Sequence, residues 1–339
     1  MNNIFNYKLS DLEDYFVALG EKKFKARQIY DWLYKKQVYD FKDMTNIKKD
    51  LIDKLAENFN TDMIKIVKKQ EDKTASKYLF KLFDDNYIEA VLMYHDYGIS
   101  VCVSSQVGCN MGCKFCESGR LKKVRNLETY EMVEQILLIE QDIKQRISSV
   151  VIMGIGEPFD NYNNVLNFIK IINSDLGIAI GARHITVSTC GLIPKIKEFS
   201  NENIQVNLAV SLHAPNNALR NKIMPINKAY PLKDLIVTLK EYIKKTNRRV
   251  TIEYVILDKV NDSRENALEL ANLLKGMNVY VNLIPYNETN NLDFKKSDRS
   301  NILKFYDTLK KQKINVTIRK EFGANIDGAC GQLRSKEVD

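Results

Sequence analysis

Long apolar segments are missing from this 339-residue sequence, and no run approaches the roughly 18 residues that a membrane-spanning helix requires. The first residues, MNNIFNYKLSDLEDYF, lack the basic and then apolar layout of a secretory signal. Short-period repeats and low-complexity tracts are missing too. These absences argue against a membrane protein, an exported protein and a repeat array. We therefore expect a cytoplasmic protein that makes no contact with a membrane.

A disulfide scaffold is not expected either, although the sequence contains six cysteines. The cytosol keeps thiols reduced, so cysteines there serve metal binding or redox chemistry and any disulfide is transient. The charge excess is modest, with 51 basic against 43 acidic residues and a net charge of +8. Such an excess suits a polyanionic partner without requiring one.

The pattern of apolar residues divides the chain into three parts. Residues 1–75 are predicted to form a small helical domain, in which side chains such as Ile29 and Leu33 share one buried face. Residues 76–97 have the composition of a linking β-hairpin. Residues 98–339 alternate short β-rich runs with amphipathic helices, as βα units do around a parallel sheet. The predicted fold is α/β, a partial (β/α) barrel with a helical N-terminal accessory domain.

Seven strands are predicted for the barrel, with helices such as Met132–Ile143 and Leu232–Lys244 between them. In such folds the loops converge at the carboxyl ends of the strands, where ligands and catalytic residues gather. Motifs that directly follow a strand are therefore the first candidates for function. The predicted strands are Val101–Ser104, Ser148–Met153, His184–Ser188, Val206–Ser211, Val250–Leu257, Val279–Ile284 and Asn315–Arg319.

Three cysteines, Cys109, Cys113 and Cys116, form a C-x3-C-x2-C motif directly after the first of these strands. Three thiolates can hold three irons of a four-iron cubane and leave the fourth open to a small molecule, whereas a structural cluster or zinc site takes four protein ligands. The closest histidine, His95, precedes Cys109 by fourteen residues. The motif favours an open iron–sulfur cluster. A Cys3His zinc site completed from a distance is the alternative.

The segment CNMGCKFC, with Phe115 before the last cysteine, resembles the cluster motif of the radical S-adenosylmethionine (SAM) superfamily. The resemblance implies one [4Fe-4S] cluster held by Cys109, Cys113 and Cys116, whose open iron binds SAM. Further phrases look like the RlmN/Cfr family of adenine-C methyltransferases and extend the resemblance along essentially the whole chain. They are CVSSQVGC, MGIGEPFDN, RHITVSTCG, VSLHAPN, MPIN, VNLIPYN and DGACGQLR.

The resemblance also implies a set of SAM contacts at or just after the predicted strands. A carboxylate or backbone acceptor in the GEP phrase suits the ammonium group of SAM. Taken without the resemblance, GIGEP is only a loop signal, because a single glycine phrase fits many turns. The implied SAM-binding residues are Gly156, Glu157, Ser188, Ser211, Leu212, His213 and Asn287.

Three more residues match the catalytic positions of the family. C2 of adenine lies between two ring nitrogens and is too electron-poor to attack a sulfonium methyl, so the family moves the carbon through a methylated cysteine and a radical. The resemblance makes Cys330 the S-methylcysteine carrier and Cys102 the resolving thiol, which releases the product through a transient disulfide. It makes Glu89 the proton acceptor. Taken singly, each cysteine would be interpreted as a small buried residue.

Two residues depart from the family phrases. Cys190 stands where serine is usual, and we interpret it as a small buried residue without a catalytic role. Glu117 stands directly after the last cluster cysteine, where a small residue is expected, so it can alter the surroundings of the cluster. Neither change removes a ligand.

Basic residues gather in three places and form a collective candidate surface for RNA phosphates. A single lysine among them would be interpreted as a solvated charge. The groups are Lys22, Lys23, Lys25 and Arg27 in the helical domain, Lys122, Lys123 and Arg125 after the cluster loop, and Arg248 and Arg249 before a strand.

The resemblance implies methylation of adenosine C2 in 23S rRNA, and of some tRNAs, with two SAM molecules per turnover. It also implies an electron donor such as flavodoxin or ferredoxin and a thiol reductant; a monomer is the default expectation. Cfr-like methylation at C8, which protects ribosomes from antibiotics, uses the same cysteines and is the main alternative. Two other classes are a non-enzymatic RNA-binding module with a structural metal and a radical-SAM activase acting on protein.

Overall fold

The computed structural model describes the chain except for residues 1, 290, 324–325, 327, 329–330 and 334–339. Its centre is a ten-stranded sheet with the order β14-β13-β12-β11-β10-β9-β6-β5-β4-β3. Within this sheet, β6, β9, β10, β11, β12, β13 and β14 run parallel to their neighbours in that series. The remaining pairs, β3 with β4, β4 with β5 and β5 with β6, are antiparallel. The strands are β3 (Lys65–Glu71), β4 (Ala75–Lys81), β5 (Tyr87–His95), β6 (Gly98–Cys102), β9 (Ser149–Ile152), β10 (Ile185–Thr189), β11 (Asn207–Ser211), β12 (Val250–Ile256), β13 (Val279–Pro285) and β14 (Val316–Ile318).

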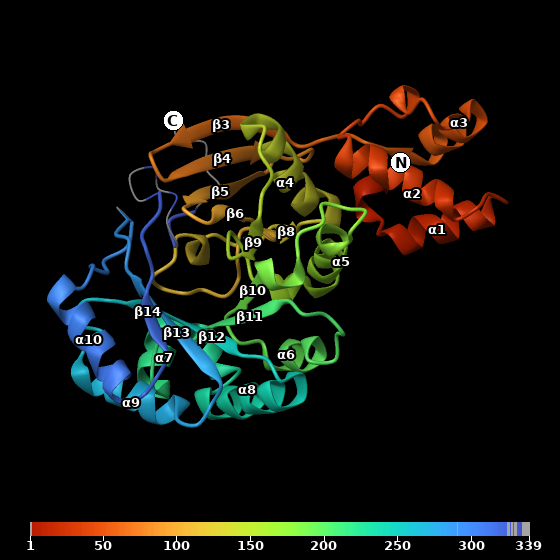
Figure 1. Cartoon of the computed structure of the whole chain (residues 1–339). Coiled ribbons are helices and arrows are strands. Elements are labelled where there is room, and N and C mark those ends of the chain that lie inside the picture. Colours follow the sequence, from red (N-terminus) through yellow and green to blue (C-terminus); the bar gives the residue numbers. More distant parts are fainter. Residues whose placement is uncertain (1, 290, 324–325, 327, 329–330, 334–339) are drawn as a thin grey trace.

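Helices connect the parallel strands and lie around the outside of the curved sheet (Figure 1). In α8, Leu232, Leu235 and Leu239 recur at helical spacing and are buried, while the exposed positions between them hold Lys233, Asp234 and Val237. Burial of the apolar faces of the helices against the sheet forms one continuous core. The helices are α4 (Thr129–Ile143), α5 (Tyr162–Asn173), α6 (Ile193–Phe199), α7 (Asn217–Ile223), α8 (Leu232–Thr246), α9 (Arg264–Leu274) and α10 (Arg299–Lys311).

The N-terminal domain is helical and packs beside α4 and α5 (Figure 1). Asn3 and the amide of Ile64 both donate to the buried Glu134 of α4, over 3.2 and 2.9 Å. The amide of Tyr130 donates to Asn6, which fixes the start of the same helix. The domain contains α1 (Leu9–Ala18), α2 (Phe24–Tyr30), a π-helical turn (Asp31–Lys35), α3 (Lys49–Asn58) and the short parallel pair β1 (Asn2–Asn3) and β2 (Phe59–Asn60).

The predicted partial barrel is confirmed, and the barrel strands lie within about three residues of their predicted limits. One difference concerns the end of the helical part, which was expected to reach residue 75. Residues Lys65–Glu71 instead form β3, which pairs with β4. Its alternation is weak, because β3 is an edge strand whose side chains are mostly exposed or half-buried. The expected hairpin, β4 and β5, is therefore part of the main sheet.

In the part of the chain that the structure describes, no helix is both long and apolar enough to cross a lipid bilayer. Two short strands, β7 (Gln106–Val107) and β8 (Arg125–Asn126), pair antiparallel and bracket the segment that carries the C-x3-C-x2-C motif. This small pair holds the cysteine loop over the carboxyl ends of the parallel strands, where the candidate site lies.

Candidate functional site at the mouth of the barrel

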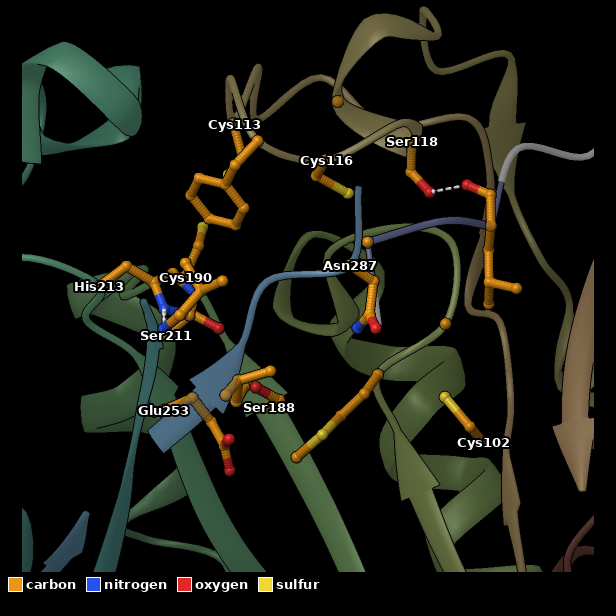
Figure 2. Close-up of a pocket in the computed structure, with 18 of the residues that line it drawn as sticks. Cys102, Cys113, Cys116, Ser118, Ser188, Cys190, Ser211, His213, Glu253 and Asn287 are labelled. Carbon is orange, nitrogen blue, oxygen red and sulfur yellow. Dashed lines mark hydrogen bonds between the residues drawn. The ribbon is translucent and has the colours of Figure 1, made fainter. Parts of the chain in front are cut away.

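One pocket opens at the carboxyl ends of the parallel strands, beneath the cysteine loop (Figure 2). Most of its lining comes from the ends of β6, β9, β10, β11, β12 and β13, so elements far apart in the sequence meet there because parallel strands end at one edge. Its lining includes Cys102, Cys109, Cys113, Cys116, Gly156, Glu157, Ser188, Cys190, Ser211, His213, Glu253 and Asn287.

The three motif cysteines all line this pocket as free thiols. Their loop is pinned at two points, where Cys109 N donates to Leu121 O and Lys114 N donates to Ile223 O of α7, over 3.1 and 2.9 Å. Burial raises the pKa of Cys109 to about 12 and also raises the pKa values of Cys113 and Cys116. Metal binding reverses this effect, since a coordinating thiol is deprotonated.

Among the described residues, no three Cys, His, Asp or Glu side chains converge closely enough to bind a single metal ion. The donor set nevertheless suits a larger group. Three thiols, one from each motif position, line a single pocket, and backbone hydrogen bonds from Met111 to Cys109 and from Gly119 to Cys116 favour thiolate character. Such donors to sulfur are typical of iron–sulfur sites.

Glu157 follows β9 and is 4% exposed. Its carboxylate accepts from the amides of Cys190 (2.8 Å) and Phe159 (3.0 Å). Burial raises the pKa of Glu157, and these hydrogen bonds oppose that rise. Gly156 has a φ of +107°, and a Cβ there would come within 2.6 Å of the Gln106 side chain. Only glycine therefore fits this turn, which aims Glu157 into the pocket.

Further polar groups come from the next strands. Ser188 is the next-to-last residue of β10 and Ser211 ends β11, and Figure 2 shows Ser211 beside the buried His213. Nδ1 of His213 accepts from Val255 N over 3.0 Å, while burial and the charge of Arg220 lower the pKa of His213 to about 3. The imidazole is therefore neutral at physiological pH. Asn287 lines the pocket after β13, whereas Leu212 is fully buried in the main core and is not among the lining residues.

Cys102 ends β6, is half-buried, and lies across the pocket from Ser211 in Figure 2. The neighbouring strand β5 contributes Val91 and Met93 to the lining. Glu89 precedes Val91 by two residues and so lies on the same face of β5. It is 3% exposed, is not among the lining residues, and forms an ion pair with Lys77 at 3.2 Å.

Cys330 lies outside the described residues. The residues that follow it, Gly331 and Leu333, line the pocket. Both are tied to the cysteine loop, because Glu117 N donates to Gly331 O (2.9 Å) and Ser118 Oγ donates to Leu333 O (2.7 Å). The C-terminal segment and the cluster motif are thus held together by direct hydrogen bonds.

Two functional candidates escaped the sequence analysis. Glu253 of β12 lines the pocket, is 4% exposed and accepts from Asn282 over 2.9 Å; burial raises its pKa. Its signal was a single carboxylate inside the apolar strand VTIEYVI. Arg220 of α7 is completely buried behind the pocket. In the sequence it looks like one more basic residue of a surface helix, so burial alone reveals it.

Comparisons with known proteins agree with this geometry. Residues 2–60 match the family described as ribosomal RNA large subunit methyltransferase N-terminal domain, and residues 103–271 match the radical SAM superfamily. A relative from Spiroplasma citri, "Probable dual-specificity RNA methyltransferase RlmN", is 54% identical, with 99% of this chain and 98% of the relative covered. The relative of the same name from Enterococcus faecalis is also 54% identical, with 99% and 97% covered.

A solved structure of a similar protein has the same fold. The crystal structure of a radical SAM methyltransferase from Sphaerobacter thermophilus superposes with a TM-score of 0.93 at 40% identity, covering 99% of this chain and all of that one. This chain belongs to the RlmN family. Members are radical SAM RNA methyltransferases, so membership implies SAM and a [4Fe-4S] cluster as cofactors. The names of these relatives favour the RlmN branch over the Cfr-like alternative.

The three cysteines on one side of the pocket would hold the cluster. The polar strand ends opposite them, from Glu157 to Asn287, include both charged and neutral hydrogen-bonding groups.

Proposed function

We propose that this RlmN-family chain methylates C2 of an adenosine in 23S rRNA and in some tRNAs. The observation that carries the proposal is one pocket lined by the three cluster cysteines, by Cys102, and by the residues that directly follow Cys330. A non-enzymatic RNA-binding module has no need of this combination. The full-length similarity to relatives named dual-specificity RNA methyltransferases supports the two RNA classes.

The cluster, when bound, would supply the electron that cleaves SAM. The residues of the chain divide the remaining work. Cys330 carries the one-carbon unit taken from a first SAM, so each turnover uses two SAM molecules. Cys102 attacks the carrier sulfur and frees the methylated RNA, leaving a Cys102–Cys330 disulfide that an external thiol must reduce. Glu89, buried on the face of β5 that leads to the pocket, accepts the proton lost from the adduct.

The strand-end residues bind and orient SAM. The buried carboxylate of Glu157 suits the SAM ammonium, because a charged hydrogen bond is strong where water is excluded. Neutral His213, Ser188, Ser211 and Asn287 offer hydrogen bonds to the ribose and adenine without adding charge. We infer a backbone or packing role for Leu212, whose side chain faces the core.

The first experiment is anaerobic reconstitution with iron and sulfide, followed by incubation with SAM, reductant and an unmodified 23S rRNA fragment. Mass spectrometry against synthetic standards identifies the product. We expect 2-methyladenosine. 8-Methyladenosine would instead establish the Cfr-like activity, and no methylated adenosine despite an intact cluster and SAM cleavage would overturn the proposal.

The cysteine roles are tested by substitution. Cys102→Ala is expected to stop turnover and accumulate a covalent RNA–protein adduct, because the thiol that resolves it is gone. Cys330→Ala removes the carrier, so it should abolish both adduct and product. Cys190→Ser, which restores the usual family residue, serves as the matched control and should still form product. Gel mobility under denaturing conditions detects the adduct, and mass spectrometry of the RNA detects the methylated product.

A further inference from the structure

Arg220 is the largest of the fully buried side chains in the described part of the molecule. Its guanidinium donates to four uncharged oxygens, and none of the ion pairs among the described residues includes it. The acceptors are Cys190 O (2.6 Å), Asn227 Oδ1 (3.0 Å), Leu212 O (3.1 Å) and Ser211 O (3.2 Å).

An arginine keeps its charge even when it is buried. A buried charge without a counter-ion is costly, which is why such charges are normally paired or bound to a metal-containing group. The four oxygens satisfy the N–H donors of Arg220, but they supply no negative charge. The site therefore calls for an anionic group nearby.

The position of α7 indicates which group this is. The helix that carries Arg220 ends at Ile223, whose carbonyl accepts from Lys114 in the cysteine loop. Residues of the two segments form one apolar cluster, in which Cys113, Cys116 and Phe115 meet Cys190, Ile223 and Met224. Cys190, whose carbonyl accepts from Arg220, belongs to this cluster, so the guanidinium is held close behind the cysteine loop.

Glu157 is a nearby acid, but it contacts a different backbone atom of Cys190. Its carboxylate accepts from Cys190 N, whereas Arg220 donates to Cys190 O. The backbone of Cys190 thus lies between the two charges. Glu157 also faces the pocket, where we have assigned it to the SAM ammonium.

We propose that Arg220 is the buried counter-charge of the iron–sulfur cluster and, through the carbonyls of Cys190, Ser211 and Leu212, a positioning residue for the SAM site. The inference rests on the cluster that the proposed function requires, and is independent of which RNA carbon is methylated. The reduction potential of such a cluster depends on its net charge and its surroundings. A fixed positive charge nearby favours the reduced state, which carries one more negative charge.

The test compares Arg220→Gln, which removes the charge, with Arg220→Lys, which keeps it. Both proteins are reconstituted anaerobically, their iron content is measured, and the cluster is titrated with redox mediators under electron paramagnetic resonance. At the wild-type midpoint potential, Arg220→Gln is expected to show a roughly tenfold lower ratio of reduced to oxidised cluster, equivalent to about 1.4 kcal/mol. Arg220→Lys should stay near wild type, although its looser hydrogen bonding should raise the KM for SAM.

Arg146→Gln is the matched control, because Arg146 also donates to backbone carbonyls, those of Ile178 and Ala179, and lies before β9, away from the pocket lining. Its midpoint should equal that of wild type. An unchanged midpoint in fully loaded Arg220→Gln would overturn the proposal. If Arg220→Gln does not fold, the test rests on Arg220→Lys alone. A wild-type midpoint potential in this variant supports the role of a positive charge at position 220, and a large negative shift of the midpoint potential overturns that role. Failure to methylate C2 would leave these outcomes unaffected.

Discussion

Glycine at position 156 shows how one residue controls the pocket. Its φ of +107° is a conformation that side chains rarely adopt, and the amide of the next residue, Glu157, donates to Gln106 over 2.9 Å. The turn and the carboxylate that it presents therefore depend on the same few atoms. A methyl group at this position would push Gln106 and Glu157 apart.

Gly156→Ala is expected to weaken SAM binding about tenfold or more, since a strained backbone costs roughly 1–3 kcal/mol. Isothermal titration of the reconstituted protein with SAM measures the effect. Gly276→Ala is the control, because Gly276 has a φ of +77° but no atom within 4 Å of an added Cβ. Equal SAM affinity in wild type and Gly156→Ala would contradict the proposed role of this turn.

Lys77 and Glu89 form an ion pair whose side chains are only 6% and 4% exposed. Lys77→Met leaves the carboxylate buried without this partner, so we expect a loss of about 3–5 kcal/mol in the free energy of unfolding. Denaturant titration measures it. Lys81→Met, on the same strand but in an exposed pair with Asp85, should cost at most about 1 kcal/mol. Similar losses in both variants would show that burial of the pair is unimportant.

At the scale of elements, α4 joins the N-terminal domain to the barrel. Its N-terminus is closed by a capping box between Glu128 and Glu131, and its buried face packs on the sheet. Glu134 on this helix accepts from Asn3 and from Ile64 N, which precede and follow the helices of the domain in the sequence. This carboxylate is therefore one of the groups that fasten the domain to the barrel.

Burial raises the pKa of Glu134 well above its ordinary value of 4.5. The folded state thus binds the proton more tightly than the unfolded state, and the contribution of Glu134 to stability is lost as pH rises from 4.5 through the raised pKa. Glu134→Gln, which is always neutral, should remove this part of the pH dependence. Thermal unfolding across this range checks it, with the exposed Glu198→Gln as control. An unchanged pH profile in Glu134→Gln would contradict the assignment.

At the scale of the whole molecule, the expected RNA-binding groups differ in availability. Lys123 pairs with Asp160, and Arg125 pairs with Asp84 and Glu131, so the cluster-side basic group is already partly neutralised. Lys22 and Lys23 of the N-terminal domain are exposed. The helical domain therefore offers more accessible positive charge than the rim of the pocket.

The double variant Lys22→Ala and Lys23→Ala should weaken RNA binding about equally for all sequences and lower the salt slope of log K by about one to two. Filter binding of an rRNA fragment across a series of salt concentrations measures both quantities. Lys310 and Lys311 are exposed on α10, and their double alanine variant is the matched control. This variant should change the salt slope of log K little unless α10 contacts RNA. An identical slope for all three proteins would exclude the helical domain as a phosphate-binding surface.

The barrel strands could be predicted because buried parallel strands are continuous apolar runs between helical segments, as in Val250–Ile256. The edge strand Lys65–Glu71 could not, because pairing on one side alone leaves its lysines exposed and its pattern weak. The cysteine motif was predictable from spacing, since its ligands are local. The pairing of Glu89 with Lys77 was not, because it joins two strands through their register.

By itself the sequence determined the βα order and the spacing of the C-x3-C-x2-C motif, because each depends on residues close together in the chain. Only the tertiary structure decided that Glu253 enters the pocket and that Arg220 lies behind the cysteine loop with no ion pair among the described residues. Burial and charge compensation are properties of residues distant in sequence, and they exist only once the strands have brought those residues to one edge.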